Sequence, residues 1–331
     1  MKEKKKKSVL KKIILIFAVI IILLIITAIL LVGKKFGKIR FKSINKDNLN
    51  INTELYSSVS DKVTQKEFDS ISNILLIGTD SQNGYDKQTH SDSIMILSIN
   101  RTKKSIKIIS IPRDIAVDIP DFKRFKLNHS YAIGQETLLI SLINSNFNLN
   151  LQEYITIDFA GIIDVINILG GIEMDITYDE MNYINRGLRK MYQISDNNYS
   201  SVKKYGKVTL NGEQAMVHAR NRTVGNDFTR SERHRDVLEA IINKLATMSI
   251  DKIWEISDYI LDDVQTNIDI YKYLGMLSTE IMHKDKYLSN ITSTMVPSLE
   301  YSKGGMQDGA YLVETDIEKA KADFIKYMYE M

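Results

Sequence analysis

Three short apolar runs in the first half of the chain predict neighbouring β-strands. They cover residues 73–78, 93–99 and 105–111, and the five polar residues between the last two have the length of a hairpin loop. Further along, helical spacing over 136–147 and 159–169 alternates with strand-like segments over 153–157 and 172–176. This alternation predicts an α/β fold with a central mixed β-sheet flanked by helices.

A longer apolar run covers residues 13–32 and contains no charged side chain. At about 1.5 Å per residue, a helix of this length spans the roughly 30 Å hydrocarbon core of a bilayer. A cleaved signal peptide fits less well, because no small-residue cleavage site follows the run. We therefore predict one N-terminal transmembrane helix that acts as an uncleaved signal anchor.

The anchor divides the chain into parts with different surroundings. The lysine-rich tail over residues 1–12 is expected to stay cytoplasmic, and everything after the anchor is expected to be extracellular. Residues 33–70 show no periodicity and are predicted to form a stalk or linking segment. Residues 249–331 carry further helix-like and strand-like segments, which we expect to complete the same α/β domain.

Charge is distributed unevenly along the chain. Residues 1–42 hold 12 lysines and arginines and one acidic residue, which leaves 32 basic and 40 acidic residues in the remaining 289. An acidic external domain is a poor nucleic-acid binder, because non-specific affinity depends on a basic surface. The chain contains no cysteine, so this domain folds without disulfides.

Two aspartates and an arginine lie at the ends of the three predicted strands. Asp80 ends the first strand, Asp92 begins the second and Arg113 follows the third. If the second and third strands form a hairpin and the first ends beside them, all three residues meet at one sheet edge. Carboxylates are the oxygen ligands that Mg²⁺ uses, together with substrate phosphate and water. We therefore predict that Asp80 and Asp92 bind Mg²⁺ or Mn²⁺.

Arginines gather again near residue 220. A helix that starts at Asn211 delivers the first of them, and a second helix carries a buried apolar stripe over residues 237–245. The helix positions three, four and seven residues before Val237 lie on the same inward face, and they carry polar side chains. Arginine offers forked donors that match phosphate oxygens. The phosphate-binding candidates are Arg220, Arg222, Arg230, Arg233 and His234.

At these residues the chain resembles the LytR–CpsA–Psr family of cell-wall glycopolymer transferases. The resemblance runs from about Ile71 to Met248, which we expect to be the catalytic core. It is carried by Ile74-Leu-Leu-Ile-Gly-Thr-Asp80, Ser91-Asp92-Ser93, Ile111-Pro-Arg-Asp114, Phe125-Lys-Leu-Asn128, Leu169-Gly-Gly171, Leu210-Asn-Gly-Glu-Gln-Ala215, Ala219-Arg-Asn-Arg222 and Asp227-Phe-Thr-Arg-Ser-Glu-Arg233.

The resemblance implies a membrane-anchored, Mg-dependent phosphotransferase whose apolar pocket holds a polyprenyl chain. It implies that a polyprenyl-pyrophosphate-linked glycopolymer (teichoic acid, capsule or another wall polysaccharide) is transferred to peptidoglycan through a phosphodiester. The implied location is the cell membrane of a Gram-positive-type surface. By the same resemblance the metal-site aspartates match Asp80 and Asp92, and the pyrophosphate-binding arginines match Arg113, Arg220, Arg222 and Arg230, with Arg233 nearby.

Three positions depart from the family pattern. His90 and Gln82 stand where arginine is usual, and His234 stands where glutamine is usual. We include His90 and His234 among the expected pyrophosphate-binding residues. Two alternative functions stay open: a non-catalytic binder or scaffold for lipid-linked polymer, and a hydrolase of the same pyrophosphate. A lipid substrate also requires an apolar channel, which we expect between the sheet and the helices over residues 138–147 and 237–245.

Overall fold

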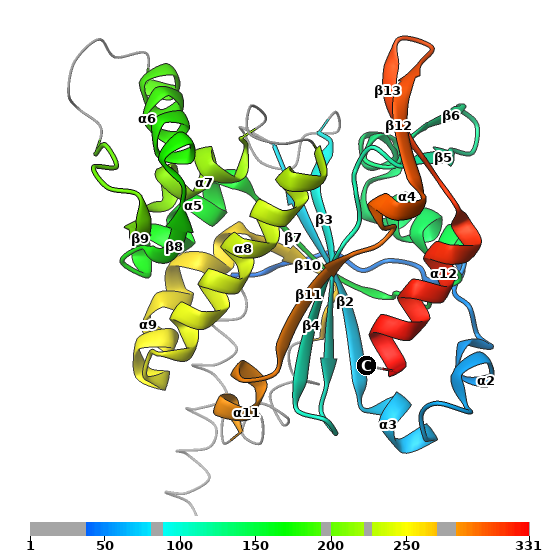
Figure 1. Cartoon of the computed structure of the whole chain (residues 1–331). Helices are drawn as coiled ribbons and strands as arrows, with labels where there is room; N and C mark the ends of the chain where they lie inside the picture. Colours follow the sequence, from blue (N-terminus) through cyan, green and yellow to red (C-terminus); the bar gives the residue numbers. More distant parts are fainter. Residues whose placement is uncertain (1–37, 81–88, 193–199, 222–226, 270–282, 331) are drawn as a thin grey trace, which may run out of the picture.

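A seven-stranded mixed sheet runs through the centre of the molecule (Figure 1). The structure is a computed structural model that describes residues 38–80, 89–192, 200–221, 227–269 and 283–330. The strand order in the sheet is β1-β10-β7-β2-β3-β4-β11. The predicted α/β class with a central mixed sheet and flanking helices is confirmed.

Most elements are short, and the longest helices flank the sheet. The sheet strands are β1 (Arg40–Phe41), β2 (Ile71–Thr79), β3 (Ser91–Asn100), β4 (Ser105–Ser110), β7 (Glu153–Asp158), β10 (Val264–Thr266) and β11 (Ile291–Met295). Three separate ribbons pair β5 (Ala116–Asp118) with β6 (Arg124–Lys126), β8 (Ile172–Ile176) with β9 (Gly206–Leu210), and β12 (Ser302–Gln307) with β13 (Ala310–Thr315). The α-helices are α2 (Leu55–Val59), α3 (Gln65–Asp69), α4 (His129–Phe147), α5 (Phe159–Ile168), α6 (Tyr178–Tyr192), α7 (Gly212–Ala219), α8 (Asp227–Ala246), α9 (Ile250–Ile260), α11 (Lys284–Leu288) and α12 (Ile317–Ile325). Single turns of other helix types are η1 (Lys46–Leu49), η2 (Leu261–Asp263), η3 (Leu299–Tyr301) and η4 (Lys326–Glu330).

The three strands predicted from the sequence form the middle of the sheet. β2 pairs antiparallel with β3, and β3 pairs antiparallel with β4 through the predicted hairpin. On the other side of β2, β7 runs parallel to it, as expected for strands joined by a long helical connection. This arrangement places the end of β2, the start of β3 and the end of β4 at the same edge.

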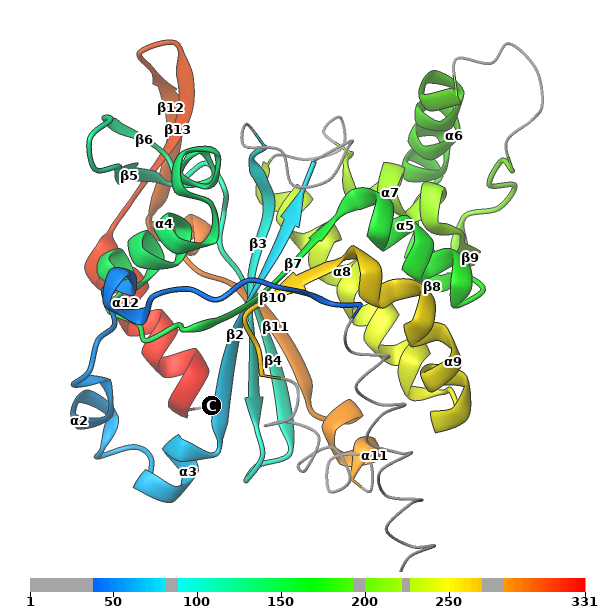
Figure 2. The same ribbon diagram turned by 180° about the vertical axis from the view of Figure 1, so that it is seen from behind.

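Helices cover both faces of the sheet, and each side has its own apolar core (Figures 1 and 2). On one face, α4, α12 and the N-terminal helices pack around Leu75, Ile96 and Ile109. On the other side, α5, α7, α8 and α9 pack around Ile166 and Ile241. The central strands are rich in isoleucine and leucine because both of their faces are covered.

Residues 40–69 belong to the folded domain, which corrects the prediction of a stalk or linking segment over 33–70. β1 pairs with β10 in the sheet, and Leu49, Leu55 and Val59 are buried in the core that α4 and α12 share. The helices of this segment are single turns of four or five residues, too short to show helical periodicity in the sequence. At the other end of the chain, β10 and β11 enter the sheet beside β7 and β4.

The predicted transmembrane segment over residues 13–32 lies outside the described residues. Within the described ranges, none of the helices combines the length and the apolar character needed to cross a bilayer.

Candidate active site

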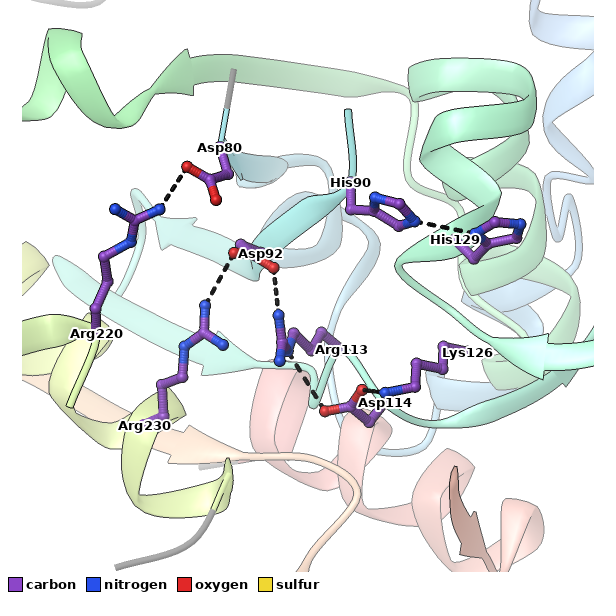
Figure 3. A network of polar contacts seen from close by, with 9 residues as sticks. All are labelled: Asp80, His90, Asp92, Arg113, Asp114, Lys126, His129, Arg220 and Arg230. Carbon is purple, nitrogen blue, oxygen red and sulfur yellow. Dashed lines mark hydrogen bonds and ion pairs between the residues drawn. The ribbon is translucent and has the colours of Figure 1, made fainter. Parts of the chain in front are cut away.

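Three strand ends meet at the sheet edge and bring three predicted residues together (Figure 3). Asp80 directly follows β2, Asp92 is the second residue of β3, and Arg113 lies three residues after β4. The β2–β3 ladder changes register between Gly78 and Thr79. Such irregularities re-aim the side chains that follow them, and this one lies next to both aspartates.

Asp92 is held by two guanidinium groups. Its Oδ1 accepts a hydrogen bond from Nη1 of Arg113, and its Oδ2 lies 3.1 Å from Nη2 of Arg230 on α8. The side chains of Asp92 and Arg230 are 11% and 4% exposed. Burial disfavours the charged carboxylate, but the two guanidinium groups outweigh burial and hold the pKa of Asp92 below its ordinary value. Asp92 is therefore a carboxylate at neutral pH and a weak proton acceptor.

Asp80 forms a second ion pair that is more accessible to solvent. Its Oδ1 accepts from Nη2 of Arg220, and the two side chains are 47% and 40% exposed. The guanidinium carbon of Arg220 lies 4.7 Å from the ring centre of Phe159, the first residue of α5. This cation–π contact fixes the guanidinium plane and leaves its edge for hydrogen bonds to oxygen.

Arg113 is oriented from behind by a buried carboxylate. Oδ2 of Asp114 lies 3.4 Å from Nε of Arg113, and its Oδ1 accepts from Nζ of Lys126 at 2.5 Å. Asp114 is almost fully buried, so these two cations neutralise it where water does not reach. The contact turns Nη1 of Arg113 toward Asp92, and Asp114 is therefore a positioning residue.

Helix α7 delivers Arg220 as the sequence predicts. The side chain of Asn211 accepts from the backbone N–H of Gln214, and the side chain of Gln214 accepts from the backbone N–H of Asn211. This reciprocal capping box starts α7, and Arg220 is the residue at its carboxyl-terminal cap. Arg222, predicted to lie beside Arg220, is outside the described residues.

Helix α8 buries Arg230, Arg233 and His234, as its periodicity predicts, but Arg233 has different partners. Nε of Arg233 lies 3.1 Å from Oε1 of Glu180 on α6, and its Nη1 donates to the carbonyl of Asn221 at 3.1 Å. These contacts reach Asn221, the residue that follows Arg220. Arg233 therefore links Asn221 to α6, and these contacts turn it toward Glu180 and Asn221 rather than toward Asp92.

His90 also turns away from the aspartates. Its Nε2 lies 3.0 Å from Nδ1 of His129, the first residue of α4, and Figure 3 shows the pair pointing away from Arg220. His90 lies two residues before Asp92 at the same sheet edge. The structure thus places it beside the predicted site while its ring contacts a second histidine.

His234 lies where the charged site meets an apolar cavity. It borders the small cleft formed by Asp92, Arg113 and Arg230, and it also lines a larger apolar cavity. Burial, reinforced by the charge of Arg230, lowers the pKa of His234 to about 3. The imidazole is therefore neutral at physiological pH and can offer an N–H group to phosphate but no positive charge.

The apolar cavity has a volume of about 200 Å³ and lies under α5, α7 and α8. Leu76, Met95 and Ile155 line it from the sheet, and Phe159 and Ile241 line it from the helices. The expected channel between the sheet and helix 237–245 is therefore present as a cavity. The expectation that helix 138–147 also lines it is wrong, because α4 packs on the opposite face of the sheet.

The donor set fits a divalent metal of the Mg²⁺ type. Mg²⁺ is usually held by one or two carboxylates plus substrate phosphate and water, and Asp80 and Asp92 supply two carboxylates at one edge. In the part of the chain that the structure describes, three or more His, Asp or Glu side chains nowhere gather into a closed metal cage. Buried hydroxyls of Thr79, Ser91 and Ser93 next to the aspartates make no hydrogen bond within the same described ranges. Hydroxyl groups at this edge therefore have hydrogen-bonding capacity left for a polar ligand with oxygen atoms, such as a phosphate.

Sequence reasoning missed the residues that orient the predicted ones. Asp114 and Lys126 lie in two of the motifs that carry the family resemblance, Pro-Arg-Asp and Phe-Lys-Leu-Asn. The sequence therefore contained a signal for them. Glu180 and Phe159 had no such signal, because their roles depend on how α6 and α5 lie relative to Asn221 and Arg220.

The sequence profile described as the LytR_cpsA_psr family matches residues 38–326. The chain belongs to this family. It is 28% identical over 262 residues to the polyisoprenyl-teichoic acid–peptidoglycan teichoic acid transferase TagV of Bacillus subtilis (strain 168), covering 75% of this chain and 62% of the relative. It is 32% identical over 200 residues to the transferase TagU of Enterococcus faecalis (strain ATCC 700802 / V583), covering 59% of this chain and 61% of that relative.

The fold is shared with solved structures. TagT of Bacillus subtilis with bound octaprenyl pyrophosphate lipid superposes with a TM-score of 0.57 at 22% identity, covering 78% of this chain and 90% of TagT. The chain spans less than two thirds of the length of TagV and TagU.

Proposed function

We propose that the protein is a membrane-anchored phosphotransferase that moves a glycopolymer from polyprenyl pyrophosphate to peptidoglycan through a phosphodiester. One observation carries the proposal: the cluster of Arg113, Arg220 and Arg230 around two aspartates adjoins an apolar cavity, and His234 borders both. A ligand that suits both parts has an anionic head and an apolar tail. The family membership and the transferase names of TagV and TagU support the same reading.

The cavity would receive the part of the tail next to the headgroup. Ligand pockets usually have volumes of about 300–1,000 Å³. This cavity, at about 200 Å³, holds only part of a long polyprenyl chain. The rest of the tail would lie beyond the cavity, toward the membrane. The lipid bound by TagT is an octaprenyl pyrophosphate, which supports this class of ligand for the shared fold.

The ion pairs of the site define where the headgroup would bind. Arg113 and Arg230 now share Asp92, and Arg220 contacts Asp80. Pyrophosphate oxygens would take up the outward-facing donors of these guanidinium groups, since arginine binds phosphate in a forked geometry. Arg222, next in sequence to this cluster, is proposed as a further donor.

Asp80 and Asp92 would hold a Mg²⁺ or Mn²⁺ ion together with the pyrophosphate. When bound, the ion would withdraw negative charge from the phosphate oxygens as a Lewis acid. The same carboxylates hold Arg220 and Arg230 in place without the ion. The two aspartates therefore organise the cationic groups of the site as well as the metal position.

The reaction would be an in-line displacement at the phosphorus that carries the glycan. A peptidoglycan sugar hydroxyl forms the new P–O bond, and the bond from that phosphorus to the bridging oxygen breaks, so polyprenyl phosphate leaves. Arg113, Arg220 and Arg230 stabilise the charge that builds up on the departing phosphate. Asp80 is more exposed than Asp92 and pairs with Arg220, whereas Asp92 is held by both Arg113 and Arg230, so we assign Asp80 to take the hydroxyl proton.

The proposed membrane location rests on the sequence, because the apolar run lies outside the described residues. The apolar run over residues 13–32 would anchor the chain, with residues 1–12 in the cytoplasm and the folded domain at the cell surface.

Turnover with and without acceptor separates this proposal from its two alternatives. The full chain in lipid vesicles would be given polyprenyl-pyrophosphate oligosaccharide, Mg²⁺ and either peptidoglycan or buffer. A transferase forms a glycan–peptidoglycan phosphodiester only with acceptor. A hydrolase releases polyprenyl phosphate equally in both samples, and a scaffold binds the lipid without releasing it.

A further inference from the structure

A partly exposed group of aromatic and imidazole rings borders the candidate active site on the side away from the apolar cavity. It consists of Phe122 and Phe125 from the β5–β6 ribbon, His129 from α4, and His90, and we call it the aromatic rim. The ring centre of His129 lies 5.0 Å from those of both Phe122 and Phe125. Its Nδ1 lies 3.0 Å from Nε2 of His90, which precedes Asp92 by two residues. The rim is therefore tied directly to the sheet edge that carries Asp92.

The rim and the cavity lie on opposite sides of Asp92. The cavity is formed under α5, α7 and α8 on one face of the sheet, and α4 packs on the other face. Figure 3 shows Arg220 on one side of Asp92 and the His90–His129 pair on the other. A lipid whose tail enters the cavity would thus have its pyrophosphate between the tail side and the rim.

In-line displacement requires the attacking and leaving oxygens to lie on opposite sides of phosphorus. In the proposed function the leaving group is polyprenyl phosphate, whose tail occupies the cavity side. The attacking hydroxyl must therefore arrive from the side of the aromatic rim.

The chemistry of the rim suits a carbohydrate. Phe122 is 49% exposed, and its ring packs edge-on against Phe125 and at a tilt against His129. An aromatic ring packs against the apolar C–H face of a pyranose, and imidazole nitrogens and the Lys123 ammonium, 4.9 Å from the centre of the Phe125 ring, offer donors at its edge. A few polar groups around an aromatic platform are typical of a site that recognises a neutral or weakly anionic ligand.

We propose that the aromatic rim is the acceptor subsite, where an N-acetylhexosamine glycan strand lies while its hydroxyl attacks the phosphorus. This inference rests on the proposed transferase function and adds to it the side of approach and the residues that hold the acceptor. The ring of Phe122 would pack against a sugar ring of the acceptor. His129 would hold His90 in place, on the side of Asp92 from which the acceptor hydroxyl arrives. Phe122, Phe125 and His129 line neither the apolar cavity nor the small cleft of Asp92, Arg113 and Arg230.

The test compares acceptor and donor kinetics in the full chain. Soluble uncrosslinked peptidoglycan strands serve as acceptor, and the KM values for strands and for lipid donor are measured separately in Phe122→Ser and His129→Ala. Loss of one aromatic contact should raise the acceptor KM about three- to tenfold with the donor KM unchanged. Tyr259→Ser removes another exposed ring, on α9 across the sheet from α4, and should change neither value. An unchanged acceptor KM in Phe122→Ser, or equal rises in both KM values, would overturn the proposal.

A direct titration keeps the inference separate from the proposed function. Glycan strands are titrated into wild type and Phe122→Ser without lipid donor, and binding is followed by calorimetry. Weaker binding by the variant supports the aromatic rim even if no transfer product forms, in which case the transferase proposal alone fails. Equal binding by the two proteins removes the rim as the acceptor subsite.

Discussion

Oδ2 of Asp92 and Nη2 of Arg230 lie 3.1 Å apart and join the start of β3 to the first turns of α8. The same carboxylate accepts from Arg113 in the loop that follows β4, so one buried anion connects three separate segments. Removing one partner of such a cluster leaves uncompensated buried charge. Asp92 is therefore both a candidate site residue and a structural one.

Asp92→Ala should destabilise the fold far more than Asp80→Ala. The first change leaves two poorly exposed cations without their shared carboxylate, at a cost of about 3–5 kcal/mol. The second breaks an ion pair whose side chains are 47% and 40% exposed, which is worth about 1 kcal/mol or less. Urea denaturation of both variants measures the difference. Equal unfolding free energies would show that the Asp92 cluster does not support the fold, whereas loss of Mg²⁺-dependent turnover is expected in both.

Stability should fall as the pH drops below about 6.5. Burial lowers the folded-state pKa of His234 to about 3 and that of His218 to about 4. In the unfolded chain the pKa of histidine is about 6.5. The unfolded chain therefore binds more protons between those values, and each histidine removes about 1.4 kcal/mol of stability per pH unit as pH falls through this window. Stability from these groups is fully present above the unfolded pKa.

His234→Gln tests this by removing one titrating group while keeping a hydrogen-bonding side chain. The unfolding free energy of the variant, measured from pH 7 to pH 4.5, should fall with a slope lower than wild type by about 1.4 kcal/mol per pH unit. A slope identical to that of wild type would mean that His234 does not titrate differently in the two states. His283→Gln, which replaces a histidine away from the site, serves as the matched control.

Local patterns predicted much of the site because strand ends and helix periods are local properties. Asp80, Asp92 and Arg113 converge because three strands of known length connect through turns, which needs no knowledge of distant packing. Arg230 and His234 fall on the inner face of α8 because that face repeats every three or four residues. Local sequence patterns are therefore enough to place these residues at the sheet edge or on the inner face of α8, although they do not identify the partners of the side chains.

Contacts between distant elements could not be read in the same way. Arg233 shares its helix face with Arg230, but its partner is Glu180 on α6, 53 residues earlier in the chain. The N-terminal segment looked like a stalk because its single-turn helices carry too few apolar positions to form a period. The face on which the lipid cavity lies depends on which helices cover each side of the sheet, and sequence spacing does not decide that.

The Arg233–Glu180 pair should hold Asn221, and with it the neighbouring Arg220, without touching substrate. Glu180→Gln keeps the size of the side chain but removes its charge, so it weakens the hold of α6 on Arg233 and on the carbonyl of Asn221. We expect lower kcat with little change in the donor KM, and faster amide hydrogen exchange in α6. The double variant Glu180→Gln/Arg233→Met should be no worse than the worse single variant, because the two residues act as a unit. Additive losses would contradict this coupling.

Arg220 should contribute through its donors, and Phe159 through the orientation of those donors. Arg220→Ala removes a preorganised cation from the proposed phosphate site and should lower kcat by about 10²–10³. Phe159→Leu keeps an apolar side chain but removes the cation–π contact, worth about 0.5–1 kcal/mol, and should lower kcat about two- to fivefold. Steady-state rates at saturating lipid and acceptor give both values. A Phe159→Leu loss as large as that of Arg220→Ala would mean that Phe159 has a role beyond orientation.

Filling the apolar cavity should discriminate between long and short lipid tails. Ile241 lines the cavity from α8, and Ile241→Phe places a larger side chain in space that the tail would occupy. Excluding two carbon atoms of the tail forfeits about 1.6 kcal/mol of apolar burial, so the KM for a long-chain donor should rise about fifteenfold. A donor whose prenyl chain is too short to reach Ile241 should keep its wild-type KM. Ile253→Phe makes the same substitution on the exposed side of α9 and controls for the added ring. If Ile241→Phe raises the KM values of both donors equally, or of neither, the cavity under α5 and α8 does not hold the lipid tail.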